Sequence, residues 1–322
     1  MIVRRLILGA IAAAGATRWR AFAQERVVRI GLLRATRQQP RDFASLTAGL
    51  AELGHVVGRN LEIVARYADG EVRRLPALAR EIATLSPTLV VVDGEPSVLA
   101  MADAAPKLPI VFTLVSDAVG QGLVQSLARP GGNLTGLTNI ALELTGKRLS
   151  LLLEAVPSIR RIAILIQPRP GVLMLRDEII AAAAQLGLVA TILEARTSDD
   201  IDAVFKRLAA EPHDAVVTIN APLFFSERTH VVTLANALGR PQIYPEREFV
   251  EAGGFMSYGV DFDVLWRRAA SFVDRILKGT KPGDMPIEQP VKLLLSVNTA
   301  TARKLGIELP PAILLRADEV IE

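Results

Sequence analysis

The sequence of 322 residues contains no cysteine, and only three of its residues are histidine. The lack of cysteine excludes disulfides, thiolate metal sites, a cysteine nucleophile and a lipid-modified cysteine. The histidines are His55, His213 and His230, and none is spaced with another histidine or a carboxylate as a metal site requires. There is also no Gly-x-Ser-x-Gly motif and no complete phosphate-binding or dinucleotide-binding loop. We therefore expect no metal, no cofactor and no enzymatic activity.

The chain also has no apolar run long enough to cross a membrane as a helix. Near its start, the apolar run Leu6–Ala16 follows Arg4-Arg5 and precedes Ala21-Phe22-Ala23, which fits the small-x-small cleavage pattern. These features predict a signal peptide over residues 1–23 and a soluble periplasmic protein after cleavage near Ala23. The arginine pair leaves twin-arginine and general secretory export both open. A tail that is not cleaved is the alternative.

A strong excess of charge of one sign is missing as well. The whole chain has 37 basic and 34 acidic residues, and four of the arginines lie in residues 1–23, which contain no acid. The mature chain would then carry 33 basic residues against 34 acidic ones, a formal net charge of −1. The basic isoelectric point of the precursor is therefore no reason to expect binding to nucleic acid or to an anionic membrane.

From Val27 onward, short apolar segments alternate with amphipathic ones in two successive series. Because β-α-β crossovers are right-handed, this order predicts an α/β fold with two doubly wound parallel-sheet lobes joined by a three-strand hinge. We assign residues 27–137 and 257–287 to the first lobe. Residues 138–256 and 288–322 are assigned to the second lobe.

The stretch from Pro109 to Asn139 is expected to hold a ligand loop and the first crossing between the lobes. Pro109–Val115 has the apolar, β-branched composition of a buried parallel strand. Ser116 and Asp117 follow at its carboxyl end, where open α/β sheets bind ligands. We expect a short helix from about Gly120 to Ala128, and then a turn that leads to the crossing.

Four motifs in this order resemble the ABC-transporter substrate-binding proteins of the tryptophan/tyrosine-uptake type. The motifs are Ser126–Gly136 (SLARPGGNLTG), Arg247–Gly254 (REFVEAGG), Met256–Gly259 (MSYG) and Leu314–Glu319 (LLRADE). The resemblance runs from about Val28 to the C-terminus. It implies a type I periplasmic-binding-protein fold, in which a ligand is held in the cleft between two lobes. Family members with known ligands bind aromatic amino acids or related small molecules and deliver them to an inner-membrane permease.

The resemblance places the ligand-binding residues at the predicted strand ends. The first lobe would supply Arg34, Gly94, Glu95, Pro96, Ser97, Ser116 and Asp117, and the second would supply Gln167, Asn220, Tyr244 and Glu246. Glu95 stands where the family usually has threonine, which predicts a ligand with a cationic or hydrogen-bond-donating group. For Tyr244, sealing the end of a buried strand is an equal alternative to stacking on a ligand. The carboxylates could also cap helices or face water.

These expectations define a periplasmic solute receptor of an ABC importer, which clasps an amino acid or an aromatic or amine-bearing small molecule. We expect a monomer that contacts the small-molecule ligand and an inner-membrane ABC permease, and no nucleic acid. Two alternatives stay open: an exported ligand sensor for a membrane receptor, and an enzyme built on the same scaffold.

Overall fold

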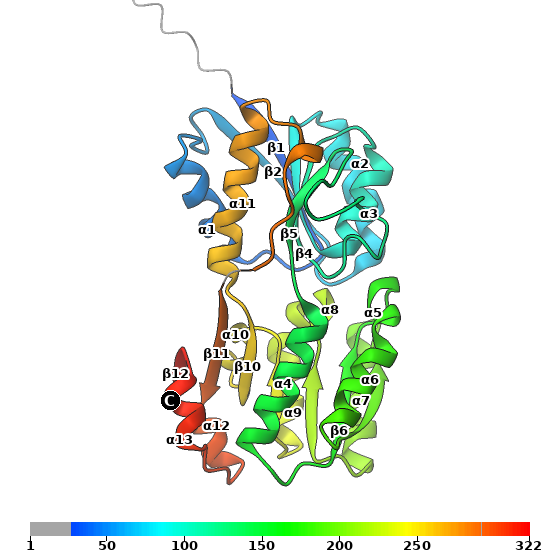
Figure 1. Cartoon of the computed structure of the whole chain (residues 1–322), viewed down its shortest axis with the longest axis vertical. Helices are drawn as coiled ribbons and strands as arrows, with labels where there is room; N and C mark the ends of the chain where they lie inside the picture. The colour runs from blue at the N-terminus through cyan, green and yellow to red at the C-terminus, as the bar shows by residue number, and fades with distance from the viewer. Residues whose placement is uncertain (1–26, 291) are drawn as a thin grey trace, which may run out of the picture.

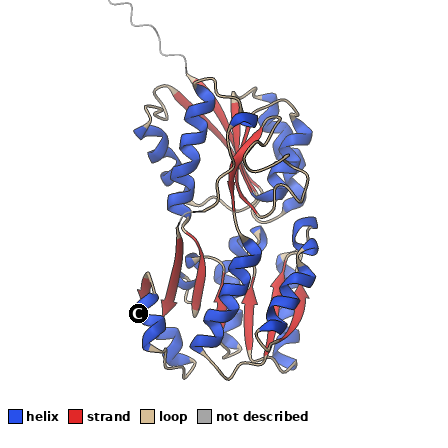
Figure 2. Cartoon of the chain, viewed as in Figure 1, coloured by secondary structure: helices blue, strands red, loops and turns tan. Residues whose placement is uncertain are grey.

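The computed structural model describes residues 27–290 and 292–322, which form two lobes stacked along the long axis of the molecule (Figure 1). The predicted signal peptide over residues 1–23 lies outside the described residues. Each lobe is a β-sheet with helices packed on its faces (Figure 2). The prediction of two doubly wound α/β lobes is confirmed.

The first lobe is built on a parallel sheet of strand order β2-β1-β3-β4-β5. The strands are β1 (Val28–Arg34), β2 (Leu61–Tyr67), β3 (Leu89–Asp93), β4 (Ile110–Val115) and β5 (Leu134–Thr138). The helices are α1 (Pro40–Glu52), α2 (Leu75–Thr84), α3 (Gly94–Ala104) and α11 (Phe262–Leu277), with short 3₁₀ turns at Val72–Arg74 and Pro282–Asp284. Every residue of β3 is buried, as its continuous run of apolar, β-branched residues predicts.

The second lobe is built on a sheet of strand order β12-β11-β10-β9-β8-β6-β7, in which only the β10–β11 pair is antiparallel among the described strands. The strands are β6 (Arg161–Ile166), β7 (Val189–Glu194), β8 (Ala215–Thr218), β9 (Gln242–Tyr244), β10 (Met256–Val260), β11 (Leu293–Asn298) and β12 (Glu319–Ile321). The helices are α4 (Ala141–Ala155), α5 (Pro170–Met174), α6 (Arg176–Gln185), α7 (Ser198–Ala210), α8 (Pro222–Ser226), α9 (Arg228–Ala237), α10 (Arg247–Glu251), α12 (Thr299–Lys304) and α13 (Pro311–Arg316).

The chain passes between the lobes three times: from β5 to α4, from β10 to α11, and from the loop after α11 back to β11 (Figure 1). The second crossing differs from the assigned boundary, because residues 257–260 belong to β10 in the second sheet. Only after Asp261, which caps α11 by accepting from the backbone N–H groups of Asp263 and Val264, does the chain join the first lobe. There α11 packs against α1.

The segment after β4 differs from its prediction too. The expected helix over residues 120–128 is wrong, since the chain makes a series of turns there. The side chain of Asp117 accepts a hydrogen bond from the backbone N–H of Gly120 at 2.7 Å, which holds the first of these turns. Such local side-chain bonding competes with helix formation, and the glycines at 120 and 122 weaken the helix further.

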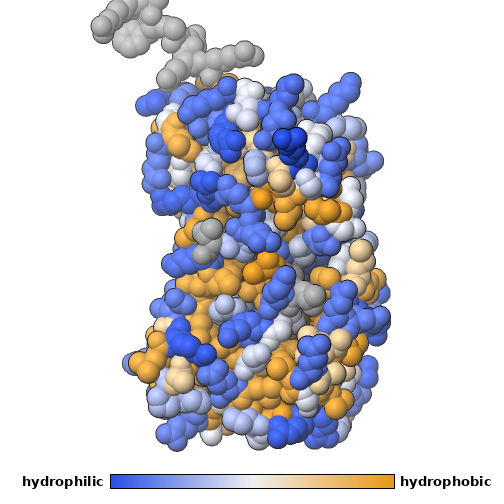
Figure 3. All heavy atoms as spheres, in the orientation of Figure 1, coloured by the Kyte–Doolittle hydropathy of each residue, from blue (hydrophilic) through white to orange (hydrophobic). Residues whose placement is uncertain are grey.

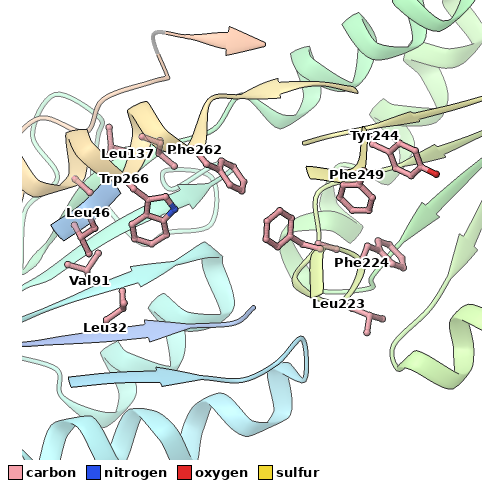
Figure 4. Packing of buried hydrophobic residues seen from close by; sticks show 14 of the residues in the cluster. Leu32, Leu46, Val91, Leu137, Leu223, Phe224, Tyr244, Phe249, Phe262 and Trp266 are labelled. Atoms are coloured by element: carbon pink, nitrogen blue, oxygen red, sulfur yellow. The ribbon is translucent and has the colours of Figure 1, made fainter. Parts of the chain in front are cut away.

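One apolar cluster joins the two lobes. Leu32, Leu46 and Trp266 of the first lobe lie on one side of it, and Phe224 and Phe249 of the second lobe lie on the other (Figure 4). Phe262, at the start of α11, bridges the two, with its ring 5.6 Å from that of Phe225. The lobes are thus in apolar contact beside the hinge, although the outline of the molecule narrows where they meet (Figure 3).

Candidate functional site

Two adjoining cavities lie between the lobes, at the carboxyl ends of the parallel strands. They enclose about 590 and about 420 Å³ of space, part of it open to solvent. Both are lined by Leu114, Arg169, Asn220 and Phe262, so they form one continuous site with walls from both lobes. Open α/β sheets bind ligands at this edge because loops and helix N-termini converge there.

The second-lobe wall carries three polar residues that follow three neighbouring strands of its sheet. Arg169 comes after β6, Asn220 after β8 and Glu246 after β9. Asn220 Nδ2 donates to Glu246 Oε1, and Arg169 Nη2 donates to the backbone oxygen of Asn220 at 3.0 Å. Arg148 of α4 lines the same cavity, and its Nε donates to the backbone oxygen of Tyr258 at 2.7 Å.

Burial is the main influence on the pKa values of Glu246, Arg148 and Arg169. It raises the pKa of Glu246 to about 8, although Arg148 and Asn220 act in the opposite direction. Burial also lowers the pKa of Arg148 to about 10, which Glu246 partly offsets, and it lowers the pKa of Arg169, which Glu95 and then Glu246 partly offset. Both arginines stay cationic at neutral pH, whereas Glu246 is largely protonated in the protein alone.

Three of the residues that line the larger cavity each have a buried polar atom without a hydrogen-bond partner in the protein. The atoms are Glu246 Oε2, Arg169 Nη1 and Asn139 Oδ1. The Asn139 side chain is fixed by donation from Nδ2 to the backbone oxygen of Leu114, which leaves its Oδ1 available as an acceptor. Because an unpaired buried polar atom is costly, their gathering at one cavity marks a place for a polar ligand. Once Glu246 is ionised, the set combines two acceptors with one cationic donor.

Leu114 gives the first-lobe wall an irregular backbone. Its φ of 59° is in the left-handed region, which a side chain as large as leucine rarely adopts. The register between β4 and β5 shifts between Phe112 and Val115, as in a β-bulge. The shift turns the end of β4 so that Leu114 lines both cavities and Ser116 lines the larger one. Strained backbone of this kind is concentrated at functional sites.

Arg34 lines the smaller cavity, but its guanidinium is bound within the first lobe. It forms ion pairs with Asp42 at 2.8 Å and with Asp93 at 3.0 Å, and it lies 4.5 Å from the centre of the Trp266 ring. Asp93 also accepts from the backbone N–H of Ala35 at 2.7 Å. These contacts fix the loop after β1, so the arginine is part of the wall.

The predicted residues on α3 have different positions. Gly94 and Pro96 line the smaller cavity. Ser97 is fully buried and donates to Asp93 at 3.3 Å, as a structural residue does. Glu95 lines neither cavity but faces the second lobe, since a Cβ on Gly171 would come within 2.7 Å of Glu95 Oε2.

Two of the remaining predicted residues are structural. Gln167 is buried, and its Oε1 accepts from the backbone N–H of Leu223 at 3.2 Å. Tyr244 is fully buried, its ring is stacked on Phe249 at 4.8 Å, and its hydroxyl points away from the first lobe (Figure 4). It occupies the end of the buried strand β9 and lines neither cavity. Asp117 holds the turn at Gly120 and borders a neighbouring groove of about 770 Å³, which shares Ser116, Asn139 and Leu175 with the larger cavity.

Sequence reasoning missed Arg148, Arg169 and Asn139. Arg148 was detectable, because it lies four residues from Leu144 and Leu152 and so interrupts the apolar stripe of its helix. Arg169 follows directly after Gln167-Pro168 at the end of β6, where the sequence predicted Gln167 alone. No sequence pattern indicated Asn139, because its side chain is fixed by the backbone oxygen of Leu114, whose position the sequence does not reveal.

The lobes touch at the rim of the site as well. Arg37 of the first lobe pairs with Glu227 of the second, and the backbone N–H of Arg37 donates to Ser226 Oγ at 3.1 Å. Beside the second crossing, Arg247 of α10 pairs with Asp263 of α11 at 2.5 Å. These contacts hold the two walls against each other.

The described ranges, 27–290 and 292–322, offer neither a metal site nor a membrane-spanning helix. No group of three or more histidine, aspartate or glutamate side chains in this part of the chain could hold a metal ion. No helix in it combines the length and the apolar character that a membrane crossing requires.

Two doubly wound lobes with a ligand-sized cavity between their strand ends define a two-lobed binding protein. The model of the family described as ABC transporter substrate binding protein matches residues 41–321. The chain belongs to this family.

Individual relatives agree with this assignment. A tyrosine-binding protein of Clostridioides difficile is 24% identical over 261 residues, which are 80% of this chain and 74% of the relative. A solved conserved domain protein of Vibrio cholerae is 26% identical with a TM-score of 0.85, over 92% of this chain and 100% of that one. An ABC domain of Streptococcus pneumoniae in complex with L-Trp is 23% identical with a TM-score of 0.84, over the same shares. The type I binding-protein fold implied by the sequence is confirmed.

Proposed function

We propose that this protein is the periplasmic solute receptor of an ABC importer and that it binds an α-amino acid with a large apolar side chain. The observation that carries this proposal is the gathering of three unpartnered buried atoms at one cavity. Two are acceptors, on Glu246 and Asn139, and one is a cationic donor, on Arg169. An α-amino acid presents the complement of this set, an ammonium group and a carboxylate on one carbon atom.

The rest of the cavity fits the side chain of such a ligand. Its lining is mainly apolar: Leu114, Leu144, Val172, Leu175, Ile179, Ile219, Pro245, Val260 and Phe262. A sugar would leave its hydroxyl groups unpaired against this surface, which is costly. Relatives described as tyrosine-binding or solved with L-Trp support an apolar side chain of aromatic size.

The position of the site between the lobes supports a receptor that closes on its ligand. Leu114 and Asn139 come with the first lobe and the hinge, whereas Arg169 and Glu246 belong to the second lobe. A ligand held by both walls binds the closed form better than the open form and therefore shifts the population toward closure. Membership of the family supports the next step, in which the closed monomer delivers its ligand to an inner-membrane permease.

A thermal-shift and calorimetric screen of residues 27–322 tests the proposal. L-tryptophan, L-tyrosine and L-leucine are compared with tryptamine, which lacks the carboxylate, and with indole-3-propionate, which lacks the ammonium group. A ligand present at a hundredfold excess over its Kd stabilises the folded state by about 2.7 kcal/mol. We expect a clear stabilisation by at least one amino acid and at most a weak one by the two analogues. Equal stabilisation by an amino acid and its analogues would contradict the proposed recognition.

A further inference from the structure

A protonated Glu246 would exchange its proton when an amino acid binds, a role that rests on the proposed function. Glu246 is buried, with 3% of the residue exposed, and it lines the larger cavity. Its Oε1 accepts from Asn220, and its Oε2 has no partner in the protein. In the protein alone, a proton can therefore reside on Oε2.

The charged and titratable groups around Glu246 come from several elements. They are Arg148 of α4, Arg169 before α5 and Glu248 of α10. Neither arginine forms an ion pair with Glu246. Arg148 Nε donates to the backbone oxygen of Tyr258, and Arg169 Nη2 donates to that of Asn220. Glu248 repels a negative charge on Glu246. Burial is the largest influence, and it favours the neutral acid.

We propose that the ammonium group of the ligand displaces this proton, so that each binding event releases one proton from Glu246 to the solvent. An ammonium group needs an acceptor, and a protonated Oε2 is a poor one. With Asn220 donating to Oε1 and the ligand donating to Oε2, both carboxylate oxygens accept and neither retains the proton. The N–H bonds of the ammonium group stay intact, and only the O–H bond of Glu246 breaks. Glu246 is thereby a specificity-determining residue for an ammonium-bearing ligand.

The exchange makes affinity depend on pH. Below a pKa of about 8 the protein must lose a proton to bind, so affinity falls as the pH falls. Between pH values of about 7 and 6, Kd is expected to rise about tenfold. Above a pH of about 8 the carboxylate is already ionised, and the release disappears.

Calorimetry on residues 27–322 in two buffers of different protonation enthalpy measures the number of protons released. The probe is L-tryptophan, or the amino acid that gives the largest shift in the screen above. At a pH of about 6.5 we expect release of about one proton by the wild-type protein. Binding without release would overturn this inference and leave the proposed function intact. No binding by any amino acid would overturn both.

Two variants test whether Glu246 is the source of the released proton. Glu246→Gln keeps an acceptor for Asn220 and has no proton to lose, so we expect weaker binding, no proton release and a nearly constant Kd between pH values of about 6 and 8. The matched control is Glu248→Gln, two residues away, because burial raises the pKa of Glu248 to about 7 as well, but this residue does not line the cavity. We expect the control still to release a proton, with the pH dependence of Kd moved to lower pH because Glu248 no longer repels the charge on Glu246. Release that persists in Glu246→Gln, or vanishes in Glu248→Gln, would overturn the assignment.

Discussion

Arg34 and Arg169 line the same cavity from opposite lobes, and they are used in opposite ways. The guanidinium of Arg34 is held by two carboxylates and lies against the Trp266 ring. The guanidinium of Arg169 has one hydrogen bond to a backbone oxygen and a buried Nη1 without a partner, and it forms no ion pair with Glu95 or Glu246, although both carboxyl groups favour its charge. The number of partners within the protein therefore separates an arginine that builds the wall from one that is available to a ligand.

The comparison also has an energetic side. Removing one partner of a buried ion pair leaves the other charge unpaired in a medium of low dielectric constant, and the stability of the fold falls. Removing a charge that has few protein partners costs the fold little, and the loss appears in ligand binding instead. Substitutions at the two positions are thus expected to affect different measurements.

The largest expected effect is on stability. Arg34→Gln would leave Asp42 and Asp93 without their cation inside the first lobe, so we expect a loss of about 3–5 kcal/mol in the free energy of unfolding. Urea unfolding followed by circular dichroism measures it. The matched control is Arg29→Gln, which breaks an exposed pair with Glu62, and there we expect a loss of at most about 1 kcal/mol. Equal losses in the two variants would refute the structural role of Arg34.

The second effect is on binding. Arg169→Gln would remove the cation that faces the ligand carboxylate, so we expect the affinity for the amino acid to fall about a hundredfold, which corresponds to about 2.7 kcal/mol. The free energy of unfolding is expected to change by about 1 kcal/mol at most, because the lost hydrogen bond goes to one backbone oxygen. Calorimetry measures the affinity and urea unfolding measures the free energy of unfolding, both on the same preparation. A large loss of stability with unchanged affinity would show that Arg169 is a structural residue, as Arg34 is, and not a ligand-binding one.

The difference between the two arginines could not be read from the sequence. The alternation of strands and helices predicted two lobes, and the rule that ligands bind at strand ends selected Arg34, Asn220 and Glu246, which do line the cavities. The same rule selected Tyr244, because sequence order gives the end of a strand but not the side of the sheet to which a side chain turns. Partners such as Asp42, eight residues from Arg34 on another element, become visible only in the fold.

Phe262 and Leu114 show a further limit of sequence reasoning. Phe262 lines both cavities only because α11 returns to the first lobe immediately after β10, and the predicted boundary placed that return several residues earlier. Leu114 was predicted as an ordinary residue of a buried strand, and its left-handed backbone comes from the register shift beside β5. Both features arise from contacts between segments that are distant in sequence, which local patterns do not record.

A third arginine gives the smallest expected effect and extends the comparison to the surface. Arg37 is about half exposed and pairs across the rim with Glu227. Because water and salt screen such a pair, we expect Arg37→Gln to weaken binding by at most about fivefold, or about 1 kcal/mol, and the difference to shrink as NaCl rises from about 0.05 to about 0.5 M. Calorimetry at both salt concentrations measures this effect. The control is Arg73→Gln, whose exposed pair with Glu71 lies within the first lobe, and it is expected to leave affinity unchanged. If Arg37→Gln lowered the affinity as much as Arg169→Gln does, at both salt concentrations, the rim pair would contribute to binding as strongly as the buried cation of Arg169.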